Sequence, residues 1–294
     1  MEKAGNSNHI TRRYIDSLLI ETRYLDSTVP TTEFSLYGET FSTPVMTAAI
    51  SHLDHHIFEG ASTALAEGAK NAGAVVWFGM ADEAEIESIA ATGARLIEII
   101  KPYADRELIY QKIRHAEKLG LLAVGIDIDH PFANDGSWDI CFDYELKALT
   151  TIELAQICKS TKLPVIVKGV LSWKDAEKAL AAGVKGMVLS HHNNRIEYAV
   201  PPLAILPEIV ERVSGRVPVF VDCEIQTGMD AFKALALGAA GVCIGRPLMA
   251  ALQKDSAKGV EEYIRNATNE LKKAMAFTGC TDLGKMDPTV IRKI

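Results

Sequence analysis

Lys168, His192 and Arg195 are the residues whose types and spacing point most clearly to chemistry. Lys168 directly follows the apolar run 164–167, and His192 and Arg195 follow the apolar run 186–189. A neutral imidazole can take a proton from a hydroxyl group or a carbon acid near neutral pH. A guanidinium holds a carboxylate in a planar fork, which a lysine ammonium does less well. Each residue alone is more often a solvated strand end or loop residue, but His192 and Arg195 together favour a function.

A candidate anion site follows the last apolar run, 241–244. Gly245 permits close approach to the backbone, and Arg246 and Pro247 begin a segment whose free helical N–H groups would attract phosphate. In α/β barrels the loops after strands seven and eight are the usual phosphate site. A lone Gly-Arg pair is a weak signal, so this prediction depends on the fold.

A metal centre is the alternative for the same strand ends, because barrel hydrolases collect histidines and aspartates from several strands. The residues that it would use are His52, Asp54, His55, His56, Asp127, Asp129, His191 and His192. No His-x-His pair occurs on a predicted strand, and residues 52–56 also fit an ordinary polar loop. We therefore expect no metal and keep metal-dependent catalysis as the alternative.

Eight short apolar runs must position these groups. They cover residues 44–50, 74–78, 96–100, 123–128, 164–167, 186–189, 217–221 and 241–244. Segments with helical character lie between them, at 57–72, 82–91, 105–119, 151–160, 172–182 and 229–237. This alternation predicts an α/β fold of parallel strands joined by right-handed crossovers. Eight strands can close and leave no exposed edge, so we predict a single (β/α)8 TIM barrel with the reactive side chains at its C-terminal end. A doubly wound open sheet is the rival.

The chain lacks a linker rich in Pro, Gly or Ser, so we expect one domain over residues 1–294. Residues 1–43 would form an N-terminal arm and lid, and residues 44–294 the barrel. Within the arm, 1–10 has the composition of a loose polar segment and 12–25 has mixed helical character. Residues 34–37 and 39–41, around Gly38, predict a small hairpin lid over one end of the barrel.

Composition narrows the class of protein. The chain has 294 residues, of which 48% are hydrophobic, and this is enough for a substantial core. A net charge of -7 argues against nucleic acid as a partner. The five cysteines form no CxxC pair and suit a reducing compartment. No N-terminal apolar segment or long apolar run is present, so we expect no membrane partner and a cytoplasmic location.

With these motifs the chain resembles the FMN-dependent α-hydroxy acid oxidase/dehydrogenase family, which includes glycolate oxidase and lactate oxidase. The resemblance is dense over 164–294 and weaker over 11–131. The segments that carry it are Leu-Pro-Val-Ile-Val-Lys-Gly-Val at 163–170, Ser190-x-His192-x-x-Arg195, the run 232–242, Ile-Gly-Arg-Pro at 244–247 and Thr-Gly-Cys at 278–280.

The resemblance implies a role for each matching residue. His192 would be the base that takes the hydroxyl proton, Arg195 would bind the substrate carboxylate, and Lys168 would stabilise the reduced, anionic flavin. The other residues expected to bind the cofactor are Ser190, Asp222, Glu224, Gln226, Gly245, Arg246, Ala48, Ala49, Gly79, Glu98 and Asp127. Gly245 and Arg246 would receive the phosphate, and Asp222 would lie near the ribityl chain or support the base.

The implied function is oxidation of a small 2-hydroxy acid to a 2-oxo acid, with hydride transfer to N5 of FMN. The implied assembly is a homo-oligomer, a tetramer as in the family. The electron acceptor stays open among oxygen, a quinone and a protein.

Two loops depart from the family pattern. The glycine of the Ser-Asn-His-Gly-x-Arg loop is replaced by Asn193, and asparagine tolerates left-handed backbone better than most residues. In the phosphate loop, Glu224 replaces a glycine and Gln226 replaces an arginine. Both changes should weaken phosphate binding, which leaves more of it to Arg246.

The substrate side departs as well. The family's Gln-x-Tyr of strand three is replaced by Glu98-Ile99-Ile100, and its second substrate arginine, after strand four, is replaced by the segment Phe-Ala-Asn-Asp at 132–135. The family's N-terminal helix with its tyrosine has no counterpart ahead of Asn8. These changes imply a substrate of different size or charge, or a loss of the redox activity. The alternatives are therefore a flavin protein of non-oxidising type, resembling type 2 isopentenyl diphosphate isomerase, and a descendant without flavin chemistry.

Overall fold

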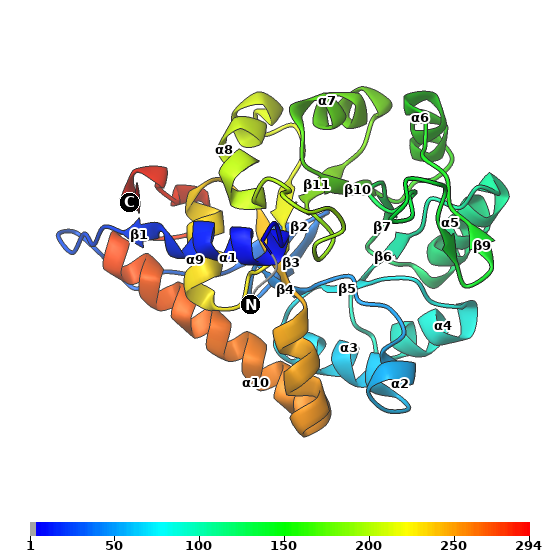
Figure 1. Ribbon diagram of the computed structural model, residues 1–294. Helices are drawn as coiled ribbons and strands as arrows, with labels where there is room; N and C mark the ends of the chain where they lie inside the picture. The colour runs from blue at the N-terminus through cyan, green and yellow to red at the C-terminus, as the bar shows by residue number, and fades with distance from the viewer. Residues whose placement is uncertain (1–3) are drawn as a thin grey trace.

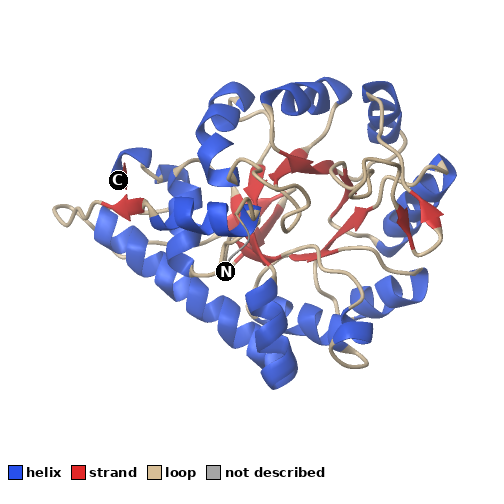
Figure 2. Ribbon diagram, in the orientation of Figure 1, coloured by secondary structure: helices blue, strands red, loops and turns tan. Residues whose placement is uncertain are grey.

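The computed structural model describes residues 4–294, and eight parallel strands form its centre (Figures 1 and 2). These are β4 (Val45–Thr47), β5 (Val76–Phe78), β6 (Leu96–Ile100), β7 (Ala123–Asp127), β10 (Val165–Val170), β11 (Gly186–Leu189), β12 (Val219–Val221) and β13 (Gly241–Ile244). Their order is β4-β13-β12-β11-β10-β7-β6-β5. A parallel bridge between Ile50 and Phe78 joins β4 to β5, and Thr47 Oγ1 donates to the Trp77 carbonyl at 2.9 Å. The predicted (β/α)8 barrel is confirmed.

The helices surround the strands, as Figure 2 shows. They are α3 (Ala61–Asn71), α4 (Glu83–Ala91), α5 (Arg106–Leu119), α6 (Thr151–Lys159), α7 (Trp173–Ala182), α8 (Pro202–Val213), α9 (Gly228–Ala236) and α10 (Arg246–Thr278). Side-chain caps fix many of the starts: Asp82, Asp105, Thr150, Ser172 and Thr227 each accept a hydrogen bond from a backbone N–H of the first turn.

The predicted helix 57–72 is wrong at its start. A short helix, α2 (Leu53–His56), comes first, and α3 begins only at Ala61. The break lies at Gly60, whose φ of +84° is left-handed. The Asp54 carboxylate accepts from the N–H groups of Gly60 and Ser62, so it stabilises the turn and the new helix start together.

The N-terminal arm is more ordered than its composition predicts. Residues 1–3 lie outside the described part, but helix α1 (Ser7–Asp16) begins inside the segment expected to be loose. The side chain of Asn6 caps it by accepting from the N–H groups of Asn8 and His9. The expected helical character of 12–25 holds only to Asp16, because β1 (Leu18–Ile20) then pairs antiparallel with β14 (Ile291–Lys293). Helix α1 packs against α8 (Figure 1).

A hairpin closes the N-terminal end of the barrel, as predicted. Strands β2 (Phe34–Leu36) and β3 (Glu39–Phe41) pair antiparallel. Their buried side chains Phe34, Leu36 and Phe41 share one apolar cluster with residues of the barrel interior. The Tyr37 hydroxyl donates to the carbonyl of Lys185, just before β11, which places the hairpin at the starts of the strands. The C-terminal ends stay open for chemistry.

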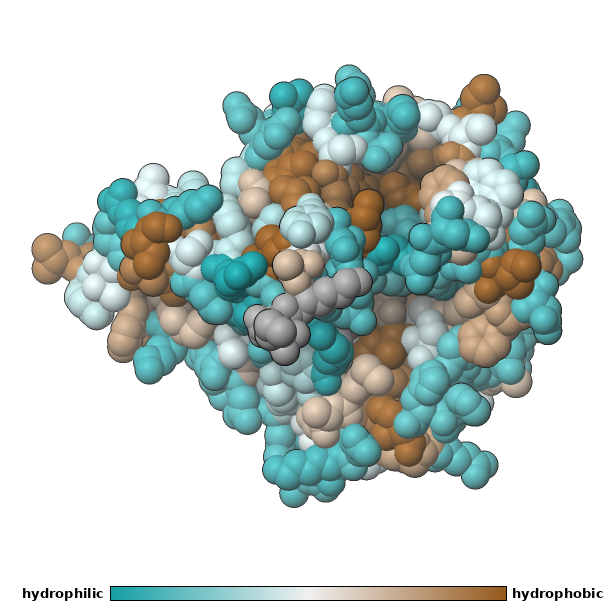
Figure 3. All heavy atoms as spheres, in the orientation of Figure 1, coloured by the Kyte–Doolittle hydropathy of each residue, from teal (hydrophilic) through white to brown (hydrophobic). Residues whose placement is uncertain are grey.

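The surface mixes hydrophilic and apolar side chains. Figure 3 shows the apolar ones of one face in separate patches divided by hydrophilic ones. A second hairpin, β8 (Ile140–Cys141) and β9 (Tyr144–Glu145), projects from the loop after β7. Within residues 4–294, none of the helices combines the length and the apolar character needed to cross a membrane.

Candidate active site

A cavity of about 590 Å³ opens at the C-terminal end of the barrel. Most of the predicted site residues line it: Ala48, Ala49, Lys168, His192, Asp222, Glu224, Gln226, Gly245 and Arg246. They come from the ends of β4, β10, β11, β12 and β13, so the closed sheet gathers groups that lie far apart in the sequence. Cavities of this size commonly bind cofactors and small substrates.

Lys168 carries a buried positive charge at this end. It pairs in register with Asp127 of the neighbouring strand β7, and its Nζ lies 3.2 Å from Asp127 Oδ1 and 4.0 Å from Asp222 Oδ2. Burial alone would lower the pKa of the ammonium group, but the carboxylates of Asp127, Asp129 and Asp222 outweigh it and raise that pKa. Burial would raise the pKa of Asp127, but the nearby positive charges hold it well below its ordinary value.

His192 is held by a carboxylate. Its Nδ1 lies 2.8 Å from Asp129 Oδ1 and 3.4 Å from Asp127 Oδ1. Donation from Nδ1–H to Asp129 leaves Nε2 as the basic nitrogen. Burial and the Lys168 charge lower the pKa of the imidazole, but Asp127 and Asp129 outweigh them and raise it. The pair therefore has the arrangement of an oriented general base.

A glycine lets Asp129 reach this position. Gly169 has a φ of +101° and lies at an irregularity of β10 between Lys168 and Val170. A Cβ at Gly169 would overlap the carboxyl group of Asp129. Only glycine combines the left-handed backbone with this close approach.

The loop that carries His192 has three successive left-handed residues, His192, Asn193 and Asn194, with φ of +50°, +54° and +67°. The expectation that asparagine would tolerate this geometry is confirmed. Helix α1 holds the loop: the Ser7 N–H donates to Asn194 Oδ1 at 2.6 Å, and Asn8 Nδ2 donates to Asn193 Oδ1 at 2.8 Å. The segment expected to be loose therefore fixes the loop that carries His192.

The neighbouring His191 is structural. It is buried, its Nε2 lies 2.9 Å from Thr11 Oγ1, and its Nδ1 accepts from the Asn194 N–H at 3.1 Å. Ser190 supports the loop, because its Oγ accepts from the His192 N–H at 3.0 Å.

Arg195 lies in an adjacent cavity of about 860 Å³, which Asp129 and Ser190 also line. Its Nη2 donates to a carboxylate oxygen of Asp139 and to the carbonyl oxygen of Phe132. Asp139 comes from the loop after β7. The guanidinium that was predicted to hold a substrate carboxylate thus holds a carboxylate of the same chain.

Lys101 was missed in the sequence. It directly follows β6, is buried, and donates to Asp127 Oδ2 at 2.6 Å and to His130 Nδ1 at 2.7 Å. His130 Nε2 donates to Asp139 Oδ2 at 3.1 Å, which continues the network to Arg195. Burial, the Lys101 charge and other nearby positive charges lower the pKa of His130 to about 3. The signal for Lys101 was present, since it follows the apolar run 96–100 as Lys168 follows 164–167.

Four predicted cofactor residues do not line the cavity, and one of them, Ser190, lines the adjacent cavity instead. Asp127 lies beneath it and pairs with Lys168 and Lys101. Gly79 packs behind the lining segment, where its N–H donates to the Ile50 carbonyl at 3.0 Å. Glu98 is directed toward α5, where its Oε1 lies 3.7 Å from Lys112 Nζ.

Glu98 gives a prediction for stability. Its carboxyl group is buried, Oε2 has no hydrogen-bond partner, and burial raises its pKa from 4.5 to about 7. The folded chain therefore binds a proton that the unfolded chain has lost between these pH values, so stability falls as pH rises through this window, by about 3 kcal/mol. Replacement Glu98→Gln should flatten that slope in urea unfolding at a series of pH values. An unchanged slope would show that Glu98 does not cause it.

The metal alternative meets a physical obstacle. Asp127, His130 and His192 offer ligand atoms that lie within 4.8 Å of one another. The ammonium groups of Lys101 and Lys168, however, lie 2.6 to 3.5 Å from atoms of this same set. Two fixed positive charges repel a divalent cation.

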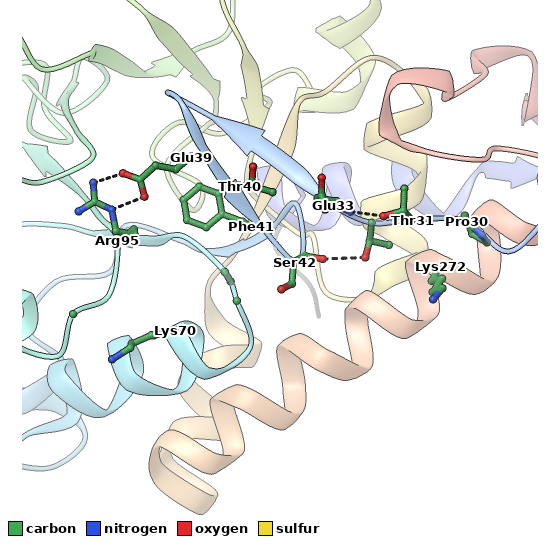
Figure 4. Close-up of a pocket in the computed structure, with 14 residues that line it drawn as sticks. Pro30, Thr31, Glu33, Glu39, Thr40, Phe41, Ser42, Lys70, Arg95 and Lys272 are labelled. Carbon is green, nitrogen blue, oxygen red and sulfur yellow. Dashed lines mark hydrogen bonds and ion pairs between the residues drawn. The ribbon is translucent and has the colours of Figure 1, made fainter.

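Another hollow, of about 580 Å³, lies at the opposite end of the barrel (Figure 4). Its Arg95 forms an ion pair with Glu39, and Lys70 Nζ donates to the carbonyl of Thr92 at 2.6 Å. No strand-end residue of the candidate site reaches it.

Comparison with known proteins gives a consistent result. The family described as FMN-dependent dehydrogenase matches residues 2–148 and 140–293. Glycolate oxidase 1 of Oryza sativa subsp. indica is 31% identical over 288 residues, covering 85% of this chain and 77% of the relative. Glycolate oxidase of Spinacia oleracea is 30% identical over 320 residues, covering 95% and 84%.

Solved structures agree with the sequence relatives. Mandelate oxidase with (S)-2-phenylpropionate has a TM-score of 0.89 at 28% identity, covering 99% of this chain and 90% of the other. A mandelate oxidase variant with the monooxide FMN adduct has a TM-score of 0.88 at 28% identity, covering 99% and 92%.

Proposed function

Because the chain belongs to the FMN-dependent dehydrogenase family, we propose that it is an FMN-dependent oxidoreductase that oxidises a small 2-hydroxy acid to a 2-oxo acid. One observation supports this proposal most strongly. The imidazole of His192, oriented by Asp129 at 2.8 Å, lines the same cavity as the buried ammonium group of Lys168. A base and a fixed positive charge at one cavity suit removal of a proton together with transfer of negative charge.

The part of the cavity next to β4 fits the ring system of a flavin. Ala48 and Ala49 line it, and such small residues leave room for a flat ring system. Lys168 supplies a positive charge that would favour the reduced, anionic flavin. FMN, when bound, supplies the acceptor for the hydride that leaves C2 of the substrate.

The side chains divide the remaining work. His192 takes the hydroxyl proton of the substrate, and Asp129 stabilises the imidazolium that forms. Arg195 holds the substrate carboxylate after its guanidinium releases the carboxylate of Asp139. Lys101 adds a second buried positive charge next to His130.

Anaerobic bleaching tests this function. The purified, FMN-loaded protein is mixed with a set of small 2-hydroxy acids without oxygen, and flavin absorbance is followed. The proposal expects at least one acid to bleach the flavin. Flavin that stays oxidised with every acid would favour a non-oxidising reaction, and a protein that binds neither FMN nor riboflavin would indicate that flavin chemistry has been lost.

The role of Arg195 gives a separate prediction. Arg195→Lys keeps the charge but loses the planar fork, so we expect KM for the acid to rise by ~10- to 100-fold, as the loss of a charge-assisted hydrogen bond would give. Substrate dependence of anaerobic flavin reduction measures it. Arg212→Lys, on α8 and paired with Glu208, is the matched surface control. An unchanged KM in Arg195→Lys would remove Arg195 from carboxylate binding.

The tetrameric assembly, the single-domain organisation and the cytoplasmic location stay predictions.

A further inference from the structure

An internal carboxylate closes one end of the cavity. Glu224 follows β12, and its side chain is only 6% exposed. One carboxylate oxygen forms an ion pair with Arg246 Nη2, and the other accepts from Gln226 Nε2 at 2.8 Å. Each oxygen therefore has a donor, and the cation that opens α10 is already neutralised.

This is the end at which an anion would be expected. The loops after β12 and β13, the seventh and eighth strands of the barrel, meet there with the N-terminus of α10. That junction commonly binds phosphate in α/β barrels. Here Arg246 and Gln226, which line the cavity and could contact a phosphate, both bind Glu224 instead.

The backbone of Glu224 is anchored as firmly as its side chain. Cys223 and Glu224 have left-handed φ of +64° and +61°, which L-residues rarely adopt. Arg12 of α1 donates to the Glu224 carbonyl at 3.0 Å and to both carboxylate oxygens of Asp230 at 2.9 Å. Asp230 in turn accepts from the backbone N–H groups of Gln226 and Thr227. These contacts oppose movement of Glu224 out of the cavity.

We infer that Glu224 replaces the cofactor phosphate as the partner of Arg246, so that this site recognises a flavin by its ring and ribityl chain alone. A phosphate dianion brought to this end would face a buried carboxylate and would have to compete with it for Arg246. Riboflavin, which ends in a neutral hydroxyl, meets neither cost. The site therefore binds riboflavin at least as tightly as FMN. This inference rests on the proposed flavin function.

The test compares two ligands on the same protein. Apoprotein is titrated with FMN and with riboflavin at neutral pH and low salt, and quenching of flavin fluorescence gives each Kd. We expect the Kd for riboflavin to be equal to or lower than the Kd for FMN, with a factor of about 3 as the precision of the comparison. The variant Glu224→Gln keeps the shape of the side chain but removes its charge. In this variant the Kd for FMN should fall by ~10-fold or more, while the Kd for riboflavin should change by less than about 3-fold.

A matched control separates this effect from the loss of any buried Glu–Arg pair. Glu39→Gln removes the charge from the Glu39–Arg95 pair at the opposite end of the barrel (Figure 4) and should change neither Kd. A Kd for FMN that is ~10-fold or more below the Kd for riboflavin on the unaltered chain would overturn the inference. The proposed function would still stand. Equal gains for both flavins in Glu224→Gln would also overturn it. If neither flavin binds to either protein, the proposed function fails, and the inference fails with it.

Discussion

Replacement of His192 by alanine should leave flavin bound but slow its anaerobic bleaching by a 2-hydroxy acid by ~10²- to 10⁴-fold, the usual contribution of a positioned general base. The reason is that no other neutral imidazole is oriented by a carboxylate at this cavity in the described part of the chain. Stopped-flow absorbance of the flavin measures the rate. His56→Ala, an exposed histidine of α2, is the control and should react at the unaltered rate.

The pH dependence of the same rate tests the role of Asp129. His192 must be neutral to accept a proton, so the rate should rise with pH through its raised pKa. Asp129→Asn removes one of the carboxylates that raise this pKa, so the rising limb should move to lower pH. Rapid bleaching in His192→Ala, or a limb that stays in place in Asp129→Asn, would contradict the assignment of this base.

Replacement of Lys168 by methionine should lower the free energy of unfolding by roughly 3–5 kcal/mol, as the removal of one partner from a buried ion pair typically does. Lys168 is 5% exposed. Its loss leaves Asp127 paired with Lys101, but it removes the ammonium group that lies 4.0 Å from Asp222 Oδ2. Urea unfolding of the apoprotein measures the change. Flavin reduction in the loaded protein should also be slower, because the positive charge next to the flavin is gone.

A double replacement shows whether the lost charge is the cause. Lys168→Met with Asp222→Asn also removes the carboxylate that Lys168→Met alone would leave without an ammonium partner, so part of the lost stability should return. If the double variant is as unstable as the sum of the two single ones, the damage comes from packing rather than from charge.

The barrel could be predicted because two independent signals agree along the chain. Apolar runs such as 96–100 and 186–189 give the strands, and capping residues such as Asp105 and Ser172 give the helix starts. The convergence of Lys168 and His192 followed from the closed sheet, because all strand ends meet at one face. The break between α2 and α3 was missed, since it depends on the left-handed backbone conformation that Gly60 adopts in the folded chain.

The partners of these residues could not be predicted in the same way. Asp129 reaches His192 only because Gly169 gives room at an irregularity of β10. The bond from Arg195 to Asp139 depends on the path of a loop without periodicity. The Glu224 substitution was visible, but its effect was predicted as simple repulsion; the structure adds that its carboxylate already binds Arg246.

The placement of flavin and substrate together tests the account most directly, and a crystal structure of the protein with FMN and a 2-oxo acid would measure it. We expect the ring system between Ala48 and Lys168, the imidazole of His192 at the substrate oxygen, and Arg195 released from Asp139 onto the substrate carboxylate. A flavin bound elsewhere, or a substrate carboxylate far from Arg195 with Asp139 still in place, would contradict the account.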